Sequence, residues 1–257
     1  MRFNETIAVV TGAGSGIGEA TAKQLAKEGA RVILVGRTKS KLERVAQEIN
    51  DTLKIPSAEV FAADVTDEED VRDLANYVKD TYGDLHVLVN NAGGSSHNKI
   101  LKLSIEDWDA VQNVNLRSVF LVSKLLGEVM VKGSQSNGVQ NRSVVNVASL
   151  SGHKAGAQIP HYSAAKAAVI NFTRALANEF SHYGIRANSV SPGFVETPLT
   201  EQGLQNDKFV DAIKRSTALK RVGRPEEISS VICFAASKEA SYMTGSDLLA
   251  DGGWLIV

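Results

Sequence analysis

The sequence lacks the features that mark several large classes of protein. Its 257 residues include a single cysteine, Cys233, so no internal disulfide can form and a reducing compartment suits the chain. A formal net charge of -1 provides neither a basic field for nucleic acid nor an acidic tail. The five histidines are scattered and show no metal-ligand spacing. We therefore expect no nucleic-acid partner and no metal site.

Long apolar runs are also missing. No segment approaches the roughly 18 apolar residues that a membrane span needs. The N-terminal stretch MRFNETIAVV becomes strand-like too early to leave room for a signal peptide. The sequence therefore predicts a cytoplasmic protein with no membrane partner.

Short β-branched runs alternate with longer segments of helical period. The strand-like runs are TIAVVT, RVILVG, AEVFAA, HVLVN, SVVNVAS, IRANSVS and DLLAD. The helix-like segments are residues 16–29, 38–50, 67–82, 104–131, 161–183 and 225–237. This alternation predicts an α/β protein with a Rossmann-type, doubly wound parallel sheet of about seven strands and helices on both faces.

No Pro-rich or charged linker divides the chain, so we expect one domain over residues 1–257. Its cofactor half reaches to about residue 150, and its catalytic and substrate-loop half covers residues 151–257. Two segments fall outside the alternation. Residues 132–143, KGSQSNGVQNRS, predict a mobile polar surface loop, whereas residues 193–224 predict a long connection of the kind that forms a lid or binding loop.

The first predicted strand runs into the glycine-rich turn TGAGSGIGEA. Its spacing is G-x-x-x-G-x-G, which differs from the strict dinucleotide fingerprint but serves the same physics. Gly12 permits a tight turn, Gly16 lets the backbone approach a pyrophosphate, and Gly18 lets the helix pack close to the strand. A phosphate then lies at the helix N-terminus. A plain strand-to-helix turn is the alternative, but the position after the first strand favours nucleotide binding.

The end of the second predicted strand decides between the two nicotinamide cofactors. An acidic residue there accepts from the ribose hydroxyls of NAD, and an arginine favours the 2'-phosphate of NADP. The chain has Gly36 in the acidic position, followed by Arg37, with Ser15 and Thr38 as further donors. Unless Arg37 is merely a solvated charge at a helix start, this predicts a preference for NADP(H), with NAD(H) possible.

The stretch HYSAAKAAV places Tyr162 and Lys166 four residues apart on a predicted helix. Positions i and i+4 lie one above the other, so the ammonium can approach the phenol. A nearby cation favours the phenolate and lowers the tyrosine pKa towards the range of general acid-base work. The alternative is a Tyr and a Lys that merely share a helical face.

These motifs together resemble the short-chain dehydrogenase/reductase family, and the resemblance spans residues 11–253. Asn115, Ser149, Tyr162 and Lys166 match the family's catalytic tetrad in identity and order, including the 13-residue step from Ser149 to Tyr162. The other matching motifs are TGAGSGIG, DV at residues 64–65, NNAG at residues 90–93, SPGFVET, GRPEEI and DGG. One departure is His86, where the family commonly has Asp; we expect local packing or surface changes and no new function from it.

The resemblance implies a nucleotide site in which DV contacts the adenine and SPGFVET holds the nicotinamide carboxamide. The implied cofactor-binding residues are Gly12, Ser15, Gly16, Ile17, Gly18, Arg37, Thr38, Asp64, Val65, Asn91, Ala92, Gly93, Tyr162, Lys166, Pro192, Gly193, Val195 and Thr197. It also implies a homotetramer formed through helices 104–131 and 161–183 and through the C-terminal DGGWLIV.

The implied reaction is hydride transfer between the nicotinamide and a ketone or secondary alcohol, with Tyr162 as general acid or base. Ser149 binds the substrate oxygen, Lys166 tunes the phenol and binds the ribose, and Asn115 holds a water that links Lys166 to solvent. Judged alone, Ser149 could be a turn residue and Asn115 a polar group satisfied by the backbone.

Several alternatives stay open. The chain could be a catalytically silent NAD(P)-binding sensor or scaffold, or an epimerase or dehydratase of the same fold. The resemblance implies 3-oxoacyl chains as leading substrates, but Tyr183 stands where carrier-dependent relatives tend to have a basic residue. The expected pocket walls are residues 94–98, 150–161 and 194–205, in which His153 and Gln158 are either hydrogen-bond partners or loop residues.

Overall fold

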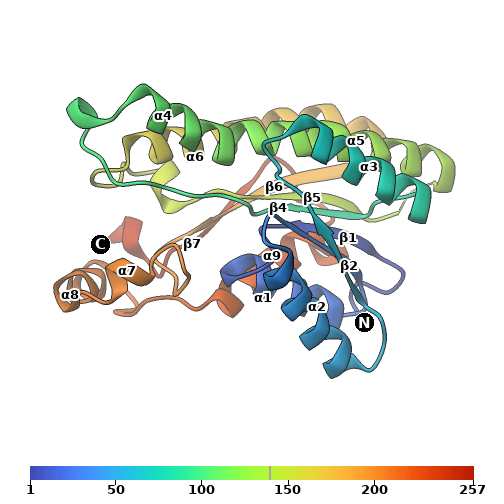
Figure 1. Ribbon diagram of the computed structural model, residues 1–257, viewed down its shortest axis with the longest axis horizontal. Helices are drawn as coiled ribbons and strands as arrows, with labels where there is room; N and C mark the ends of the chain where they lie inside the picture. The colour runs from blue at the N-terminus through green and yellow to red at the C-terminus, as the bar shows by residue number, and fades with distance from the viewer. Residues whose placement is uncertain (139) are drawn as a thin grey trace.

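A seven-stranded parallel sheet forms the centre of the computed structural model, which describes residues 1–138 and 140–257 (Figure 1). The strand order is β3-β2-β1-β4-β5-β6-β7, so the direction of winding reverses between β1 and β4. The strands are β1 Ile7–Thr11, β2 Arg31–Gly36, β3 Ala58–Ala62, β4 Val87–Asn90, β5 Arg142–Val147, β6 Ile185–Pro192 and β7 Asp247–Ala250. The predicted doubly wound sheet is confirmed.

Helices cover the sheet in two layers, as Figure 1 shows. One layer consists of α1 Gly16–Lys27, α2 Lys39–Leu53 and α9 Pro225–Ala236. The other consists of α3 Glu68–Tyr82, α4 Ile105–Gln112, α5 Ser118–Asn137 and α6 Pro160–Phe180. Two further helices, α7 Glu201–Leu204 and α8 Asp207–Ser216, lie in the connection after β6. Of the helices in the described part of the chain, none is both long and apolar enough to cross a membrane.

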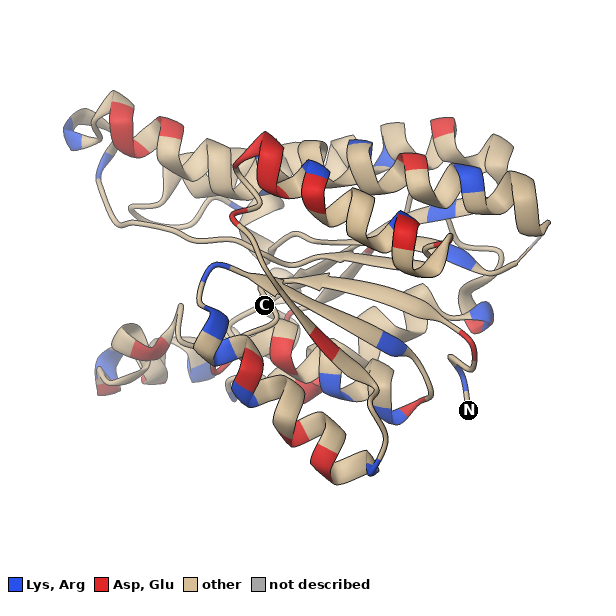
Figure 2. Cartoon of the chain, turned by 45° about the vertical axis from the view of Figure 1, so that its right-hand side comes forward, with Lys and Arg blue, Asp and Glu red and all other residues tan. Residues whose placement is uncertain are grey.

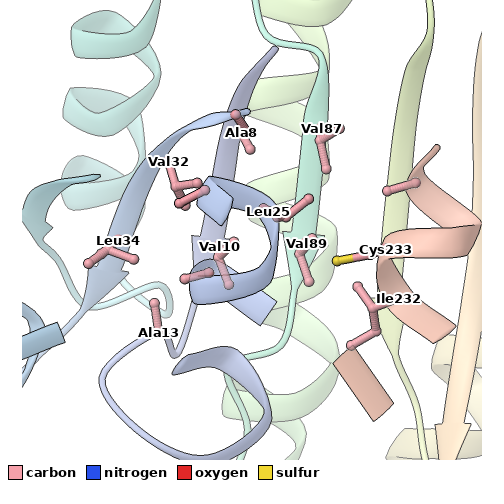
Figure 3. Packing of buried hydrophobic residues seen from close by; sticks show 14 of the residues in the cluster. Ala8, Val10, Ala13, Leu25, Val32, Leu34, Val87, Val89, Ile232 and Cys233 are labelled. Atoms are coloured by element: carbon pink, nitrogen blue, oxygen red, sulfur yellow. The ribbon is translucent and has the colours of Figure 1, made fainter. Parts of the chain in front are cut away.

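Successive side chains on β1, β2 and β4 enter different cores, which explains why these strands read as continuous apolar runs. Val10 and Val32 pack with Leu25 and Ile232 on the α1/α9 side, as Figure 3 shows, whereas Val9 packs on the α3/α5 side. Charged residues of both signs follow the helices and loops, and the strands carry few of them (Figure 2). Helices therefore bury both faces of the sheet, and a site can form only where the carboxyl ends of the strands meet the loops.

The polar loop predicted for residues 132–143 is wrong over most of its length. Helix α5 continues to Asn137 and β5 begins at Arg142, while residue 139 lies outside the described residues. Tertiary contacts hold the extra helical turn: Asn137 Nδ2 donates to Asp84 Oδ2 at 2.9 Å, and Ser134 Oγ donates to the carbonyl oxygen of Tyr183 at 2.6 Å. A side chain at Gly133 would collide with the Asp84 carboxylate, so this glycine permits the packing.

The single helix predicted over residues 104–131 is interrupted. A π-helical turn, Asn113–Arg117, separates α4 from α5. Short 3-10 turns complete the structure at Ile100–Lys102, Leu150–Gly152, Ser181–Tyr183, Lys238–Ala240 and Trp254–Ile256. Single π turns inside helices frequently occur at functional sites.

Candidate active site

The glycine turn after β1 has the backbone that the spacing predicts. Gly12 and Gly16 have φ values of 65° and 57°, in the left-handed region that glycine adopts without strain. A Cβ on Gly18 would collide with the carbonyl oxygen of Gly12 and the carboxamide of Asn91. The turn and α1 therefore pack as closely as they do only with glycine at these positions.

The N-terminus of α1 presents backbone donors that suit a phosphate group. Ser15 is the N-cap residue but makes no side-chain capping bond, and the first N–H groups of a helix have no partner inside it. A Cβ on Gly16 would lie 3.2 Å from Thr197 Cγ2, so the bare glycine backbone lies opposite the loop after β6. Free donors and a glycine cradle together fit the pyrophosphate of a dinucleotide.

Thr11 holds the glycine turn to the NNAG segment. Its Oγ1 accepts from the backbone N–H groups of Asn91 and Ala92, both at 3.0 Å. Asn91 Nδ2 donates in return to the carbonyl oxygens of Thr11 and Gly12, at 3.0 and 3.3 Å. The Asn91 side chain therefore shapes the cradle. Thr11 positions the NNAG segment beside the glycine turn, a role that the sequence did not predict. Its position directly before Gly12 was the available signal.

The ends of β2 and β3 bring Arg37 and Asp64 together. Arg37 Nη1 lies 3.9 Å from Asp64 Oδ2, and the Arg37 side chain is 74% exposed. Burial opposes ionisation of Asp64, but two hydrogen bonds from Thr66 and the Arg37 charge outweigh it and keep the Asp64 pKa below its usual value. A Cβ on Gly36 would touch only the Leu42 side chain, at 3.5 Å or more. Thr38 is the N-cap of α2 and makes no side-chain capping bond.

Lys166 and Tyr162 lie on the first turns of α6, beside the end of β5. Lys166 is 4% exposed, its Nζ donates to the carbonyl oxygen of Val147 at 2.8 Å, and it lies 5.5 Å from the centre of the Tyr162 ring. Within residues 1–138 and 140–257, no carboxylate pairs with this ammonium. Burial therefore lowers the pKa of Lys166 from 10.5 to about 8.

The prediction of a lowered Tyr162 pKa is wrong for this structure. Desolvation raises the pKa of the Tyr162 phenol, and an interaction with Ser149 offsets only part of that rise. The physical reason is that burial disfavours the phenolate, while the ammonium is directed to the Val147 carbonyl. The phenol is therefore protonated at neutral pH.

Ser149 and Asn115 complete the predicted tetrad, and each also makes the local bonds that the simpler interpretation expects. Ser149 Oγ accepts from the Ser151 N–H at 3.1 Å. Asn115, fully buried in the π turn, donates through Nδ2 to the carbonyl oxygens of Gly94 and Val111, at 2.7 and 2.9 Å. A Cβ on Gly93 would lie 2.8 Å from Asn115 Oδ1 and 3.6 Å from Lys166 Nζ. Gly93 thus lies between the two side chains.

The loop after β6 closes the other side of the site. A Cβ on Gly193 would collide with the backbone of Asp251, and its N–H donates to Ala250 at 3.0 Å. Val195 is buried and forms a bridge with Gly223. The remaining predicted cofactor residues lie at the same edge of the sheet: Ile17 packs against the α1/α9 core, Val65 is buried after β3, Pro192 ends β6, and Thr197 contacts Thr200.

Two residues of the expected pocket walls are engaged within the protein. His153 Nε2 lies 2.8 Å from Asp247 Oδ2 on β7. Gln158 has a strained backbone, with φ at 61°, and its carbonyl oxygen accepts from the Asn98 N–H at 2.8 Å. Over the same described ranges, no group of three or more His, Cys, Asp or Glu side chains could hold a metal ion.

Comparisons with known proteins find several reductases and dehydrogenases that are similar to this chain. A family model described as Enoyl-(Acyl carrier protein) reductase matches residues 12–255. A 3-oxoacyl-[acyl-carrier-protein] reductase of Thermotoga maritima is 39% identical, with 100% of each chain covered. A meso-2,3-butanediol dehydrogenase of Serratia marcescens is 36% identical over 98% of this chain and 96% of the relative. The crystal structure of a putative NAD(P)-dependent gluconate 5-dehydrogenase from Beutenbergia cavernae, with NADP bound, is 36% identical, covers all of both chains and superposes with a TM-score of 0.92.

Proposed function

This chain belongs to the short-chain dehydrogenase/reductase family, and we propose that it transfers a hydride between NADP(H) and a neutral or weakly polar ketone or secondary alcohol. Membership of the family makes it an NAD(P)-dependent oxidoreductase, as the motifs predict. The observation that carries the proposal is the buried Lys166 ammonium beside Tyr162, which has no carboxylate partner among the described residues and lies at the sheet edge that also holds the glycine cradle.

In reduction, Tyr162 gives its phenolic proton to the substrate carbonyl oxygen. The bound nicotinamide supplies the hydride. Ser149 donates a hydrogen bond to the same oxygen and stabilises the negative charge that develops there. Lys166 orients the cofactor ribose and, as a cation, attracts the phenolate that remains after proton transfer. Asn115 fixes the backbone of Gly94 next to this cluster.

The raised pKa of Tyr162 suits the reductive direction, because a neutral phenol is ready to donate at physiological pH. Oxidation of an alcohol needs the phenolate as a base. That direction should therefore become faster as the pH rises.

The preference for NADP(H) rests on the end of β2. Gly36 places no carboxylate at the end of β2, and among the described residues the exposed Arg37 makes one long ionic contact, with Asp64. Ser15 and Thr38 each carry a hydroxyl without a capping bond and add donors nearby. A 2'-phosphate carries close to two negative charges, so this environment favours NADP over NAD.

For the substrate, we propose 3-oxoacyl chains as the leading subclass. The Thermotoga relative is named for a 3-oxoacyl substrate and the Serratia relative for a diol, and both reactions interconvert a ketone and a secondary alcohol. Delivery on an acidic acyl carrier is not part of the proposal, because the exposed Tyr183 occupies the place of a basic residue.

We further propose a cytoplasmic homotetramer. A groove between the outer faces of α5 and α6 is lined by Phe120, Phe172 and Tyr183, and Phe120 is 49% exposed. The C-terminal Ile256 and Val257 are 83% and 70% exposed. Apolar surfaces of this kind are usually covered by another chain. A light-scattering mass near the 27.5 kDa of one chain would contradict the tetramer.

The direct test is oxidation of NADPH by the purified protein with a panel of small ketones and 3-oxoacyl thioesters, followed by the absorbance of the reduced nicotinamide. We expect turnover with NADPH exceeding that with NADH. Tight NADPH binding without turnover of any ketone would instead favour the silent sensor. A far better rate with carrier-bound than with free thioesters would show that an acyl carrier delivers the substrate, against the expectation from Tyr183.

A further inference from the structure

The segment that follows NNAG, residues 94–98, is fixed to the helical layer at every second residue. Gly94 bonds to the Asn115 carboxamide, its N–H at 3.3 Å and its carbonyl oxygen at 2.7 Å. Ser96 Oγ lies 2.9 Å from His161 Nε2. Asn98 donates to the carbonyl oxygen of Gln158 and, through Nδ2, to Asp107 Oδ2 at 3.2 Å. The segment begins beside Gly93, which lies against Lys166 and Asn115.

His161 is the middle anchor and has no role in the chemistry proposed above. It directly precedes Tyr162 on α6 and is fully buried. Gln112 Nε2 donates to its backbone carbonyl at 2.9 Å, which ties this turn of α6 to α4. In the described part of the chain, the only partner of its ring is Ser96, because Nδ1 is buried without a hydrogen bond.

Packing alone does not account for a histidine at this position. A leucine would fill apolar space without leaving a buried ring nitrogen unpaired, and buried polar atoms are nearly always hydrogen-bonded. Burial lowers the pKa of His161; Asp107 opposes that shift and His97 reinforces it. The ring is therefore neutral at physiological pH and can share one hydrogen bond with a serine hydroxyl without burying a charge.

We propose that His161 is a positioning residue that, through Ser96, holds residues 94–98 against α6 and so sets the shape of the substrate pocket beside Tyr162. The inference rests on the proposed ketone reductase function and adds a specificity-determining pair to it. Ketone binding should therefore depend on the hydrogen bond between Ser96 and His161. NADPH binding should not, because Thr11 and Asn91 hold the cofactor cradle independently.

The test compares four variants: Ser96→Ala, His161→Leu, both together, and His161→Gln, whose amide can reach the place of Nε2. We expect each of the first two to raise KM for the ketone about tenfold, with kcat within about threefold of wild type. The double variant should be no worse than the more affected single variant, because both changes remove the same bond. His161→Gln should restore KM to within about threefold of wild type.

Ser181→Ala and His182→Leu, in the exposed 3-10 turn that follows α6, are matched controls and should leave KM unchanged. Amide hydrogen exchange supplies a readout that does not need turnover: residues 94–98 should exchange faster in both single variants, and those of α1 should not. Additive KM effects, a parallel loss of NADPH affinity, or unchanged exchange of residues 94–98 would each overturn the proposal. A wild-type protein without ketone turnover would refute the proposed function, and the exchange rates would still decide whether the anchor exists.

Discussion

Two buried cations lie at opposite edges of the same sheet, and their surroundings differ. Arg142, at the start of β5, is 1% exposed and binds the Asp84 carboxylate through Nε and Nη2, while Asn137 donates to the same carboxylate. Lys166, beside the end of β5, is 4% exposed and has a single carbonyl oxygen as its bonded partner among the described residues. In the described part of the chain, the buried cation at the amino edge of the sheet therefore has a carboxylate partner, and the buried cation at the carboxyl edge has none.

This difference indicates that the buried cation at the amino edge stabilises the fold, whereas the one at the carboxyl edge serves the site. A paired buried charge is neutralised where it stands and stabilises one arrangement of the chain, and losing either partner is costly. Burial destabilises the charged form of an ammonium that has no carboxylate partner, and this lowers its pKa. The protonation state of such a group changes with pH near neutrality and with the binding of an anion. Substitutions at the two edges should therefore affect different measurable quantities.

The largest effect is expected at the carboxyl edge. Tyr162→Phe removes the proton donor and leaves the hydride geometry intact, so turnover should fall at least about a thousandfold, equivalent to about 4 kcal/mol. The free energy of unfolding and NADPH binding should change little, since the phenol ring remains. Steady-state kinetics and a fluorescence titration with NADPH measure the two quantities. A near wild-type rate would refute the tetrad assignment.

The amino edge should show the converse. Arg142→Met leaves the Asp84 carboxylate buried without its cation, and breaking such a pair costs about 3 to 5 kcal/mol of the free energy of unfolding. Urea unfolding at a fixed protein concentration measures this loss. The rate per folded molecule should stay within about twofold of wild type, because the pair lies at the far edge of the sheet from Tyr162.

Adding Asp84→Asn to Arg142→Met is the control, because it removes the stranded charge and should recover part of the stability. If Arg142→Met instead lowered turnover as strongly as Tyr162→Phe, the two edges would not be separable and the comparison would fail.

The carboxyl edge was predictable from sequence because its residues occur in ordered motifs. The glycine turn, the NNAG segment and the Tyr162/Lys166 spacing each point to a strand end or a helix start, and a parallel sheet brings such ends together. The amino edge was not predictable, because its contacts join residues distant in the chain. The polar composition of residues 132–137 favours a loop, yet their bonds to Asp84 and Tyr183 keep them helical.

His86 belongs to the same unpredicted edge. Its Nδ1 accepts from the Ile7 N–H at 3.1 Å and its Nε2 lies 2.9 Å from Gln140 Oε1. These contacts are local, as expected for this position.

The sequence also failed to predict the direction of the Tyr162 pKa shift. The i, i+4 spacing places the ammonium near the phenol, but spacing does not report how deeply either group is buried.

Cofactor choice offers a smaller effect at the carboxyl edge. Replacing Gly36 by Asp and Arg37 by Ser should move the preference from NADP towards NAD by about 2 to 4 kcal/mol, because a carboxylate replaces a cation near the 2'-phosphate. The site accepts the new side chain, since a Cβ on Gly36 touches only Leu42. The ratio of kcat/KM for the two cofactors measures the change. A wild-type preference for NAD, or no response to the double substitution, would show that Arg37 is a solvated surface charge.

The smallest predicted effect tests the unpaired ammonium itself. In Lys166→Met, the buried charge is gone, so the difference in unfolding free energy between variant and wild type should depend on pH. The wild-type lysine has a pKa of about 8 when folded and an ordinary value of 10.5 when unfolded. Below pH 8 both states carry the proton, and the wild type bears the full cost of the buried charge.

Between these two values the unfolded chain holds a proton that the folded chain has released, so the stability of the wild type rises with pH relative to the variant. The unfolding free energy of the variant minus that of the wild type should therefore fall by about 2 kcal/mol between roughly pH 7 and pH 10. Urea unfolding at a series of pH values measures it, with Arg142→Met as the matched control: a guanidinium stays charged throughout this range, so its difference from wild type should stay flat. A flat Lys166→Met difference would mean that the ammonium is effectively paired or solvated, and the two edges of the sheet would then treat their buried cations alike.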